Sequence, residues 1–165
     1  MRYSGSILRV MLLDGFINNF ILMTQLDCYY ELSYYTLAHP DTIYFIHQHI
    51  VDAYHAQTAD EKTKVIEVVF SLVGLYLLIE KDCTGRQIQN IHIELSKYKN
   101  NLPKIKIPQF KGKITVADVL QVQPGGERDE VIKAWCASVW LAYQEQHEII
   151  FQFVHQHVKP ANKEF

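Results

Sequence analysis

The stretch VIEVVFSLVGLYLLI, residues 65–79, decides the fold of this chain. It is apolar almost all the way round a helix, so a helix formed here has to be buried on every side. Asp60 is a suitable N-cap, which predicts a central helix over residues 60–81. The least apolar strip of this helix carries Glu67, Ser71 and Gly74, where another helix could approach closely. We therefore predict an all-α protein built around this segment.

Five further segments carry helix patterns: residues 26–38, 40–57, 84–98, 115–120 and 128–158. Capping boxes mark two of their starts, Thr84 with Gln87 and Thr115 with Asp118, because each side chain can satisfy a backbone donor of the first turn. The last segment is the longest predicted helix. Short connections favour antiparallel neighbours. The prediction is an antiparallel bundle of four to five long helices with one short helix.

An extended Pro/Lys-rich loop is expected over residues 100–114, because Pro103, Pro108 and Gly112 interrupt any helix there. Between Leu95 and Ala117 there is no acidic residue. This basic stretch, interleaved with Tyr98 and Phe110, could bind single-stranded nucleic acid or a phosphorylated ligand. A solvated loop is the commoner explanation, so nucleic acid is disfavoured. Its lysines are Lys97, Lys99, Lys104, Lys106, Lys111 and Lys113.

The length and composition indicate one ordinary globular domain. Apolar residues make up 48% of the 165 residues and charged residues 21%, and the net charge is −2. These values exclude a disordered chain and a strongly basic or acidic one. We place the single domain at residues 26–158 and a C-terminal tail at 159–165.

Residues 1–25 are apolar, but Arg9, Asp14, Asn18 and Asn19 interrupt the run. A membrane span needs about 20 predominantly apolar residues, and a signal peptide needs an unbroken apolar region before a cleavage site. We predict neither, and interpret this segment as an N-terminal extension, either an added amphipathic helix or a stretch upstream of the domain. The three widely spaced cysteines, Cys28, Cys83 and Cys136, suggest no disulfide framework and fit a reducing cytoplasm.

His47 is the residue that points to a site. If residues 40–57 form one helix, an apolar stripe brings His47 to the same face as Ile43, Ile50 and Tyr54, while His49, Asp52 and His55 fall outside it. A neutral imidazole in an apolar interface needs a hydrogen-bond partner or a metal. For Asp52 we expect a bond to a neighbouring segment or to solvent, and for Glu80 a structural ion pair with Arg86.

Two further histidines are predicted on or beside apolar helix faces. His92 lies at the margin of the apolar stripe of the helix over residues 84–98, and His147 lies on the apolar face of the last helix. With His47 they could form a three-histidine site for a divalent metal ion, since bundle cores are where facing helices build such sites. The pocket around them would include Tyr54, Gln57, Tyr143 and Trp140. The alternative is that each histidine is a packed polar residue, because no two of them have a metal-binding spacing.

Six separated motifs occur in an order that resembles an uncharacterised bacterial family classed as a domain of unknown function. The similarity spans roughly residues 27–158 and implies a small helical protein without an assigned activity. In that family a second histidine often stands where this chain has Thr58. Histidine placement is also distantly similar to DinB-type metal-binding bundles, an analogy of fold only. The motifs begin at Asp27, Phe45, Leu72, Thr84, Thr115 and Trp135.

Two hypotheses follow for function. The first is a cytoplasmic helical-bundle protein with a polar histidine-containing pocket, holding a divalent metal ion that activates water or a thiol cofactor. The second is a non-catalytic binding or scaffold protein whose histidines are structural. The sequence names no substrate or partner, and it leaves open both catalysis and a homo-oligomer.

Overall fold

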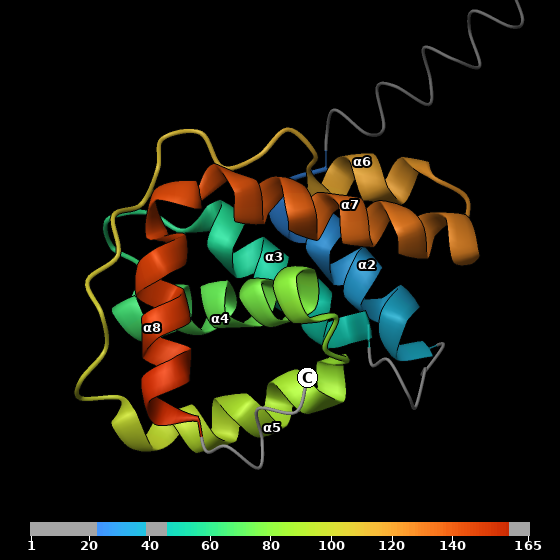
Figure 1. Ribbon diagram of the computed structural model, residues 1–165. Coiled ribbons are helices and arrows are strands. Elements are labelled where there is room, and N and C mark those ends of the chain that lie inside the picture. Colours follow the sequence, from blue (N-terminus) through green and yellow to red (C-terminus); the bar gives the residue numbers. More distant parts are fainter. Residues whose placement is uncertain (1–22, 39–45, 159–165) are drawn as a thin grey trace, which may run out of the picture.

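The computed structural model describes residues 23–38 and 46–158. In this part of the chain all regular structure is helical, so the predicted all-α class is confirmed (Figure 1). The elements in chain order are α2 (Gln25–Ala38), α3 (Ile46–Thr58), α4 (Val65–Lys81), α5 (Gly85–Leu95), η1 (Ser96–Tyr98), α6 (Val116–Gln121), α7 (Gly126–Ala142), η2 (Gln144–Gln146) and α8 (His147–His157).

Helix α4 is the centre of the molecule, as its sequence predicts. It has contacts with α3, α5, α7 and α8, and every residue from Ser71 to Leu78 is buried. The least apolar strip of α4 faces α3 at Gly74, where the carboxyl group of Asp52 lies directly against the glycine. The predicted close approach of a second helix therefore occurs at this glycine.

The start of α4 differs from the prediction. The helix begins at Val65, and Lys64 in the N-cap position makes no side-chain cap. Asp60 instead closes a separate turn, where its Oδ1 accepts from the amide of Lys62 at 2.8 Å and from the Thr63 hydroxyl at 3.1 Å. A turn and a helix N-terminus both use an Asp side chain as an acceptor for nearby amides, so the local sequence does not separate them.

Both predicted capping boxes are present and begin their helices. The hydroxyl of Thr84 accepts from the amide of Gln87 ahead of α5, and the hydroxyl of Thr115 accepts from the amide of Asp118 ahead of α6. In each box the second side chain returns to the amide of the threonine, at 2.8 Å. Because these bonds are local, the sequence alone defines both helix starts.

The predicted helix over residues 128–158 is wrong as a single element. It breaks at Tyr143 into α7 and α8 with the short η2 between them, and α8 leaves the direction of α7 (Figure 1). Two hydrogen bonds stabilise the break, one to a distant segment and one across the break itself. The Tyr143 hydroxyl donates to the carbonyl of Ala56 at 2.7 Å. His147 Nε2 donates to the carbonyl of Trp140 at 2.9 Å, which satisfies an acceptor at the end of α7.

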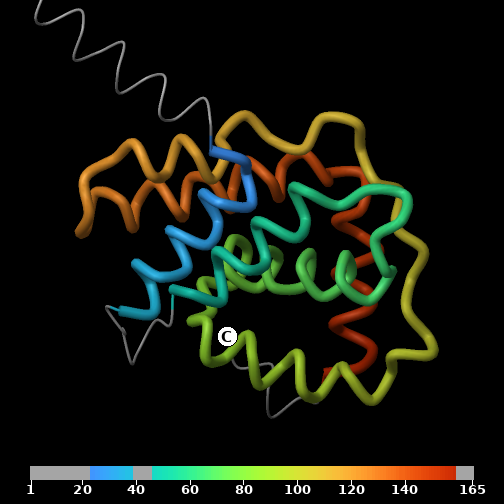
Figure 2. The backbone as a smooth tube through the Cα atoms, turned by 180° about the vertical axis from the view of Figure 1, so that it is seen from behind, coloured from blue at the N-terminus to red at the C-terminus, as the bar shows by residue number. Residues whose placement is uncertain are grey.

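Residues 99–114 run along the outside of the molecule between η1 and α6 (Figure 2). Polar side chains bind their backbone at three places. Gln146 Oε1 accepts from the amide of Lys106 at 3.2 Å, and Ser138 Oγ accepts from the amide of Lys113 at 2.7 Å. Gln57 Nε2 donates to the carbonyls of Lys111 and Ile114, at 3.2 and 2.7 Å. This extended segment is therefore attached to α3, α7 and η2.

None of the helices within residues 23–38 and 46–158 combines the length and apolar character needed to cross a bilayer. Most of the predicted N-terminal extension, residues 1–22, lies outside the described residues, as does the predicted tail at 159–165. The first part of the predicted helix over 40–57 does so as well.

Candidate functional site

A pocket of about 280 Å³ opens where three helices meet. The start of α3, the end of α4 and the first turns of α7 form its walls. We call it the α3–α4–α7 pocket. Its lining residues are Ile46, His49, Leu78, Asp82, Cys83, Gly126, Asp129, Glu130 and Lys133.

His49 enters this pocket because α3 buries a different face from the predicted one. The buried residues of α3 are His49, Ile50, Asp52, Ala53 and Ala56. They follow the i, i+3, i+4, i+7 spacing of one helix face. His47, Val51 and Tyr54 are only half-buried. The prediction that His49 and Asp52 lie off the buried face is therefore wrong.

The imidazole of His49 is the distinctive group of the pocket. The residue is 4% exposed, and its Nδ1 has no hydrogen-bond partner within the described residues. Burial, together with the nearby Lys133 charge, lowers the pKa of His49 to about 4. The ring is thus neutral near pH 7. The ring lines the pocket, but Nδ1 itself is out of contact with solvent, so a ligand can bond to it only when the side chain turns.

The end of α4 brings Asp82 and Cys83 to the pocket. Asp82 takes the left-handed conformation, with φ 51° and ψ 33°, and this ends the helix. The amide of Cys83 then donates to the carbonyl of Leu77 at 3.0 Å. Burial, and next the charge of Asp82, raises the pKa of the Cys83 thiol to about 11. The thiol therefore stays protonated and is a poor nucleophile.

The first turns of α7 supply the opposite wall. Gly125 precedes the helix with φ 120°, and no side chain caps the first turn. Asp129, Glu130 and Lys133 follow on the pocket side. The Tyr35 hydroxyl of α2 donates to Asp129 Oδ1 at 3.4 Å. With Asp82, the pocket has three carboxylates and one ammonium group, and His49 adds no charge.

These groups are better suited to binding than to acid–base chemistry. A general base needs a pKa near the working pH, and His49 lies well below it. A nucleophilic thiol needs a lowered pKa, and that of Cys83 is raised. What the pocket offers is a neutral imidazole, fixed charges and an apolar wall from Ile46 and Leu78.

The three histidines predicted as a metal site each have a different neighbour. His47 Nδ1 lies 2.9 Å from the Thr36 hydroxyl of α2. The ring of His92 stacks on Phe70 of α4 with 5.2 Å between centroids, and that of His147 stacks on Trp140 at 3.7 Å. Across residues 23–38 and 46–158, no group of three His, Cys, Asp or Glu side chains could hold a metal ion. The metal site is therefore unsupported.

His92 resembles His49 in its electrostatics. Burial lowers its pKa to about 4 as well, and its Nε2 lacks a partner among the residues that the structure describes. It lies against Phe70 at the α4–α5 contact and does not line the α3–α4–α7 pocket. A packed neutral histidine fits this position.

The four residues predicted to surround the histidines make structural contacts. Gln57 Oε1 accepts from the indole of Trp135 at 2.9 Å, and Tyr143 bonds to α3 as described above. Tyr54 stacks on Tyr29 of α2, with 4.1 Å between centroids. The indole of Trp140 donates to Glu80 Oε1 at 2.9 Å, a partner for Glu80 that the sequence did not suggest. None of these four lines the α3–α4–α7 pocket.

Asp52 is a buried acid of α3 that does not line the pocket. It is 3% exposed, and Gln48 Nε2 donates to its Oδ1 at 3.1 Å. Its Oδ2 has no partner in the described part of the chain. Burial raises the pKa of Asp52 well above its usual value, and the Gln48 bond opposes that rise. The expected bond to another segment or solvent is therefore wrong.

We expect Asp52→Asn to remove a pH dependence of stability. The native carboxyl is held neutral while the unfolded one ionises above pH 4, so its contribution to stability is lost as pH rises. The free energy of unfolding of the variant, minus that of the parent, should rise by up to about 1.4 kcal/mol per pH unit between pH 5 and the native pKa. Urea unfolding at pH 5, 6, 7 and 8 measures this.

The matched control is Asp60→Asn. Asp60 is fully exposed and the pKa of its carboxyl is lowered by the amide of Lys62 and then by Thr63. It is ionised in both states throughout this range, so its difference curve should be flat. A flat curve for Asp52→Asn as well would show that the native Asp52 is charged.

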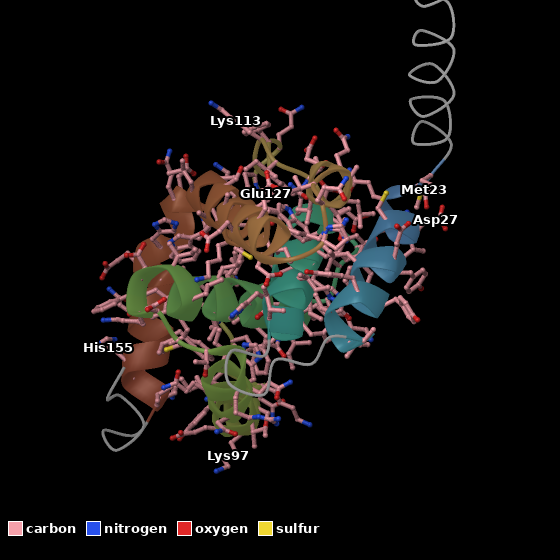
Figure 3. All side chains as sticks on the ribbon, turned by 90° about the vertical axis from the view of Figure 1, so that its right-hand side faces the viewer. Met23, Asp27, Lys97, Lys113, Glu127 and His155 are labelled. Carbon is pink, nitrogen blue, oxygen red and sulfur yellow. The ribbon has the colours of Figure 1, made fainter. Side chains whose placement is uncertain are left out.

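The lysine-rich stretch does not form one basic patch. Lys97 and Lys113 lie at opposite ends of the molecule (Figure 3). Lys106 pairs with Glu145 at 3.6 Å on the surface. A single-stranded nucleic acid needs a continuous groove of positive charge, so this arrangement gives no support to that hypothesis.

A second pocket, of about 430 Å³, lies where the extended segment passes the break between α7 and α8. Residues 106–109 and 142–146 line it with both apolar and polar side chains. The described part of the chain contributes no buried unpartnered polar atom to its walls. We therefore regard the α3–α4–α7 pocket as the better candidate.

The comparisons with known proteins identify a family but no activity. A sequence model described as a family of unknown function (DUF5946) matches residues 26–144. No curated protein and no solved structure matches the chain.

Proposed function

Because this chain belongs to the DUF5946 family, whose function is unknown, we propose a function from the geometry alone: the protein binds a small polar metabolite in the α3–α4–α7 pocket without transforming it. The pocket is close in size to the smallest ligand sites of proteins. It combines an apolar wall with a few polar groups, which is the usual composition of such sites.

The observation that carries this proposal is His49. A buried imidazole nitrogen without a partner costs about 1 to 3 kcal/mol relative to a bonded one. The cost is offset when the side chain turns and a ligand in the pocket supplies the missing hydrogen bond. Several residues of the described chain have a buried polar side-chain atom without a partner. Of these residues, only His49 lines this pocket.

Binding is favoured over catalysis by the protonation states. The neutral, weakly basic His49 and the protonated thiol of Cys83 suit hydrogen bonding and packing. Neither is prepared to abstract a proton or attack an electrophile near pH 7. We also infer a cytoplasmic location, since Cys28, Cys83 and Cys136 are all buried free thiols.

A fragment screen by two-dimensional ¹H–¹⁵N NMR on the full chain tests the proposal. We expect polar fragments to shift the amides of Asp82, Gly126 and Lys133 together. His49→Leu should weaken these fragments by about tenfold, which corresponds to one lost hydrogen bond. His155→Leu is the control, because it makes the same change at an exposed position of α8.

Two results would overturn the proposal. One is a screen in which no fragment shifts the amides of the pocket. The other is an unchanged affinity in His49→Leu, with a spectrum that shows a folded protein.

A further inference from the structure

The charges of the α3–α4–α7 pocket are of both signs and are not neutralised by one another. Lys133 makes no ion pair in the described chain with the carboxylates one turn before it on α7, those of Asp129 and Glu130. Asp82 brings a third carboxylate from the end of α4. Residues with carboxylates and an ammonium group thus line the same volume without a direct pair, and two of them, Glu130 and Lys133, are exposed.

The start of α7 adds a second feature of positive polarity. The helix is 17 residues long, and no side chain caps its first turn, although Glu127 and Asp129 lie in that turn. The amides of such a turn favour a negatively charged group. Gly126 lies in this turn and lines the pocket. The helix end and Lys133 together are therefore suited to a ligand carboxylate.

The carboxylates of the pocket require the opposite charge. Three of them outweigh one ammonium group while His49 stays neutral. A purely anionic ligand would meet a net negative site, and a purely cationic one would leave Lys133 and the helix end without a partner. A ligand that carries both charges a few bonds apart satisfies both sets.

Resting on the proposed function, we infer that the ligand is a free α-amino acid or a close zwitterionic analogue. Its carboxylate binds at Lys133 and the first turn of α7, and its ammonium group lies among the carboxylates. The imidazole of His49 turns on binding, so that Nδ1 accepts a hydrogen bond from the ligand. Its side chain packs on Ile46 and Leu78. The pocket volume of about 280 Å³ has room for one amino acid.

Isothermal titration of the full chain with each of the twenty L-amino acids tests this inference. The best amino acid is then compared with its N-acetyl derivative, which lacks the ammonium group, and with its amide, which lacks the carboxylate. We expect each derivative to bind at least about tenfold more weakly, because each loses one charge-assisted contact.

Two variants separate the two ends of the ligand. Lys133→Met should weaken the amino acid by about tenfold and leave its amide unchanged. Asp129→Asn should weaken the amino acid and leave its N-acetyl derivative unchanged. Lys97→Met is the control, since this exposed lysine lies outside the pocket.

The outcomes distinguish the inference from the proposed function. If the amide binds as well as the amino acid, the ligand is a cation, and the inference fails while the pocket remains a binding site. The same holds if fragments bind at the pocket and no amino acid does. If neither fragments nor amino acids shift the pocket amides, both are wrong.

Discussion

Gly74→Ala is expected to lower the free energy of unfolding by about 3 kcal/mol, at the upper end of overpacking effects. A Cβ at this position would lie 2.5 Å from Cγ of Asp52 and closer still to its Oδ2. The carboxyl group cannot move aside easily, because Asp52 is 3% exposed and belongs to the buried face of α3. The two helices would have to separate. Urea unfolding at pH 6 measures the change.

Two further variants make this prediction specific. Gly126→Ala places the same methyl group where no atom lies within 4 Å, so it should leave stability unchanged or raise it by up to about 1 kcal/mol. Asp52→Ala in the Gly74→Ala background removes the clashing carboxyl. A coupling of about 1 kcal/mol or more is expected between the two sites. Additive effects would show that the clash is not with Asp52.

Gln57→Leu is expected to lower the free energy of unfolding by about 3 kcal/mol, because three hydrogen bonds end on this one amide. Its Oε1 accepts from the indole of Trp135, and its Nε2 donates to the carbonyls of Lys111 and Ile114. Leucine has a similar size, so the loss is of polar partners and not of volume. The extended segment should detach from α3 before the rest of the protein unfolds.

Trypsin cleavage after Lys111 and Lys113 measures this detachment, alongside urea unfolding. Both lysines should be cut faster in Gln57→Leu than in the parent. Gln156→Leu is the control, because it changes an exposed glutamine of α8 and should alter stability by less than about 0.5 kcal/mol. Equal cleavage rates in the parent and in Gln57→Leu would mean that other contacts hold the segment.

Local signals made much of the fold predictable. The helix over residues 26–38, the two capping boxes and the buried arc from Ile132 to Tyr143 could all be recognised, because neighbouring residues determine them. The strip through Gly74 on α4 also indicated where a second helix approaches. In these places the residues that determine the local structure lie within about one helical turn of it.

The candidate site was less predictable. The proposed stripe on α3 centred on His47, whereas the buried face centres on Ala53 and includes His49. His47, His49 and Asp52 lie close together in the sequence, so either of two faces of α3 could be the buried one. Hydrophobicity alone favoured the wrong face. The small residues Ala53 and Ala56, both fully buried, were the available signal, since small side chains let a neighbouring helix come close.

The pocket itself had no signature in the sequence. Asp82, Glu130 and His49 are far apart along the chain, and each looks like an ordinary surface or core residue alone. Asp82 reaches the pocket because α4 ends at that residue, and Glu130 because α7 begins four residues before it. Only the packing of three helices brings them to one volume.

The chain by itself determined the class of fold, the central position of residues 65–79 and the starts of α5 and α6, because burial and capping act over one or two turns. Tertiary structure decided the face of α3 that is buried, the break at Tyr143 and the lining of the pocket. Each of these depends on bonds or contacts between segments distant in sequence, such as the Tyr143 hydroxyl with Ala56. Such contacts depend on how the helices pack against one another, which no single helix encodes.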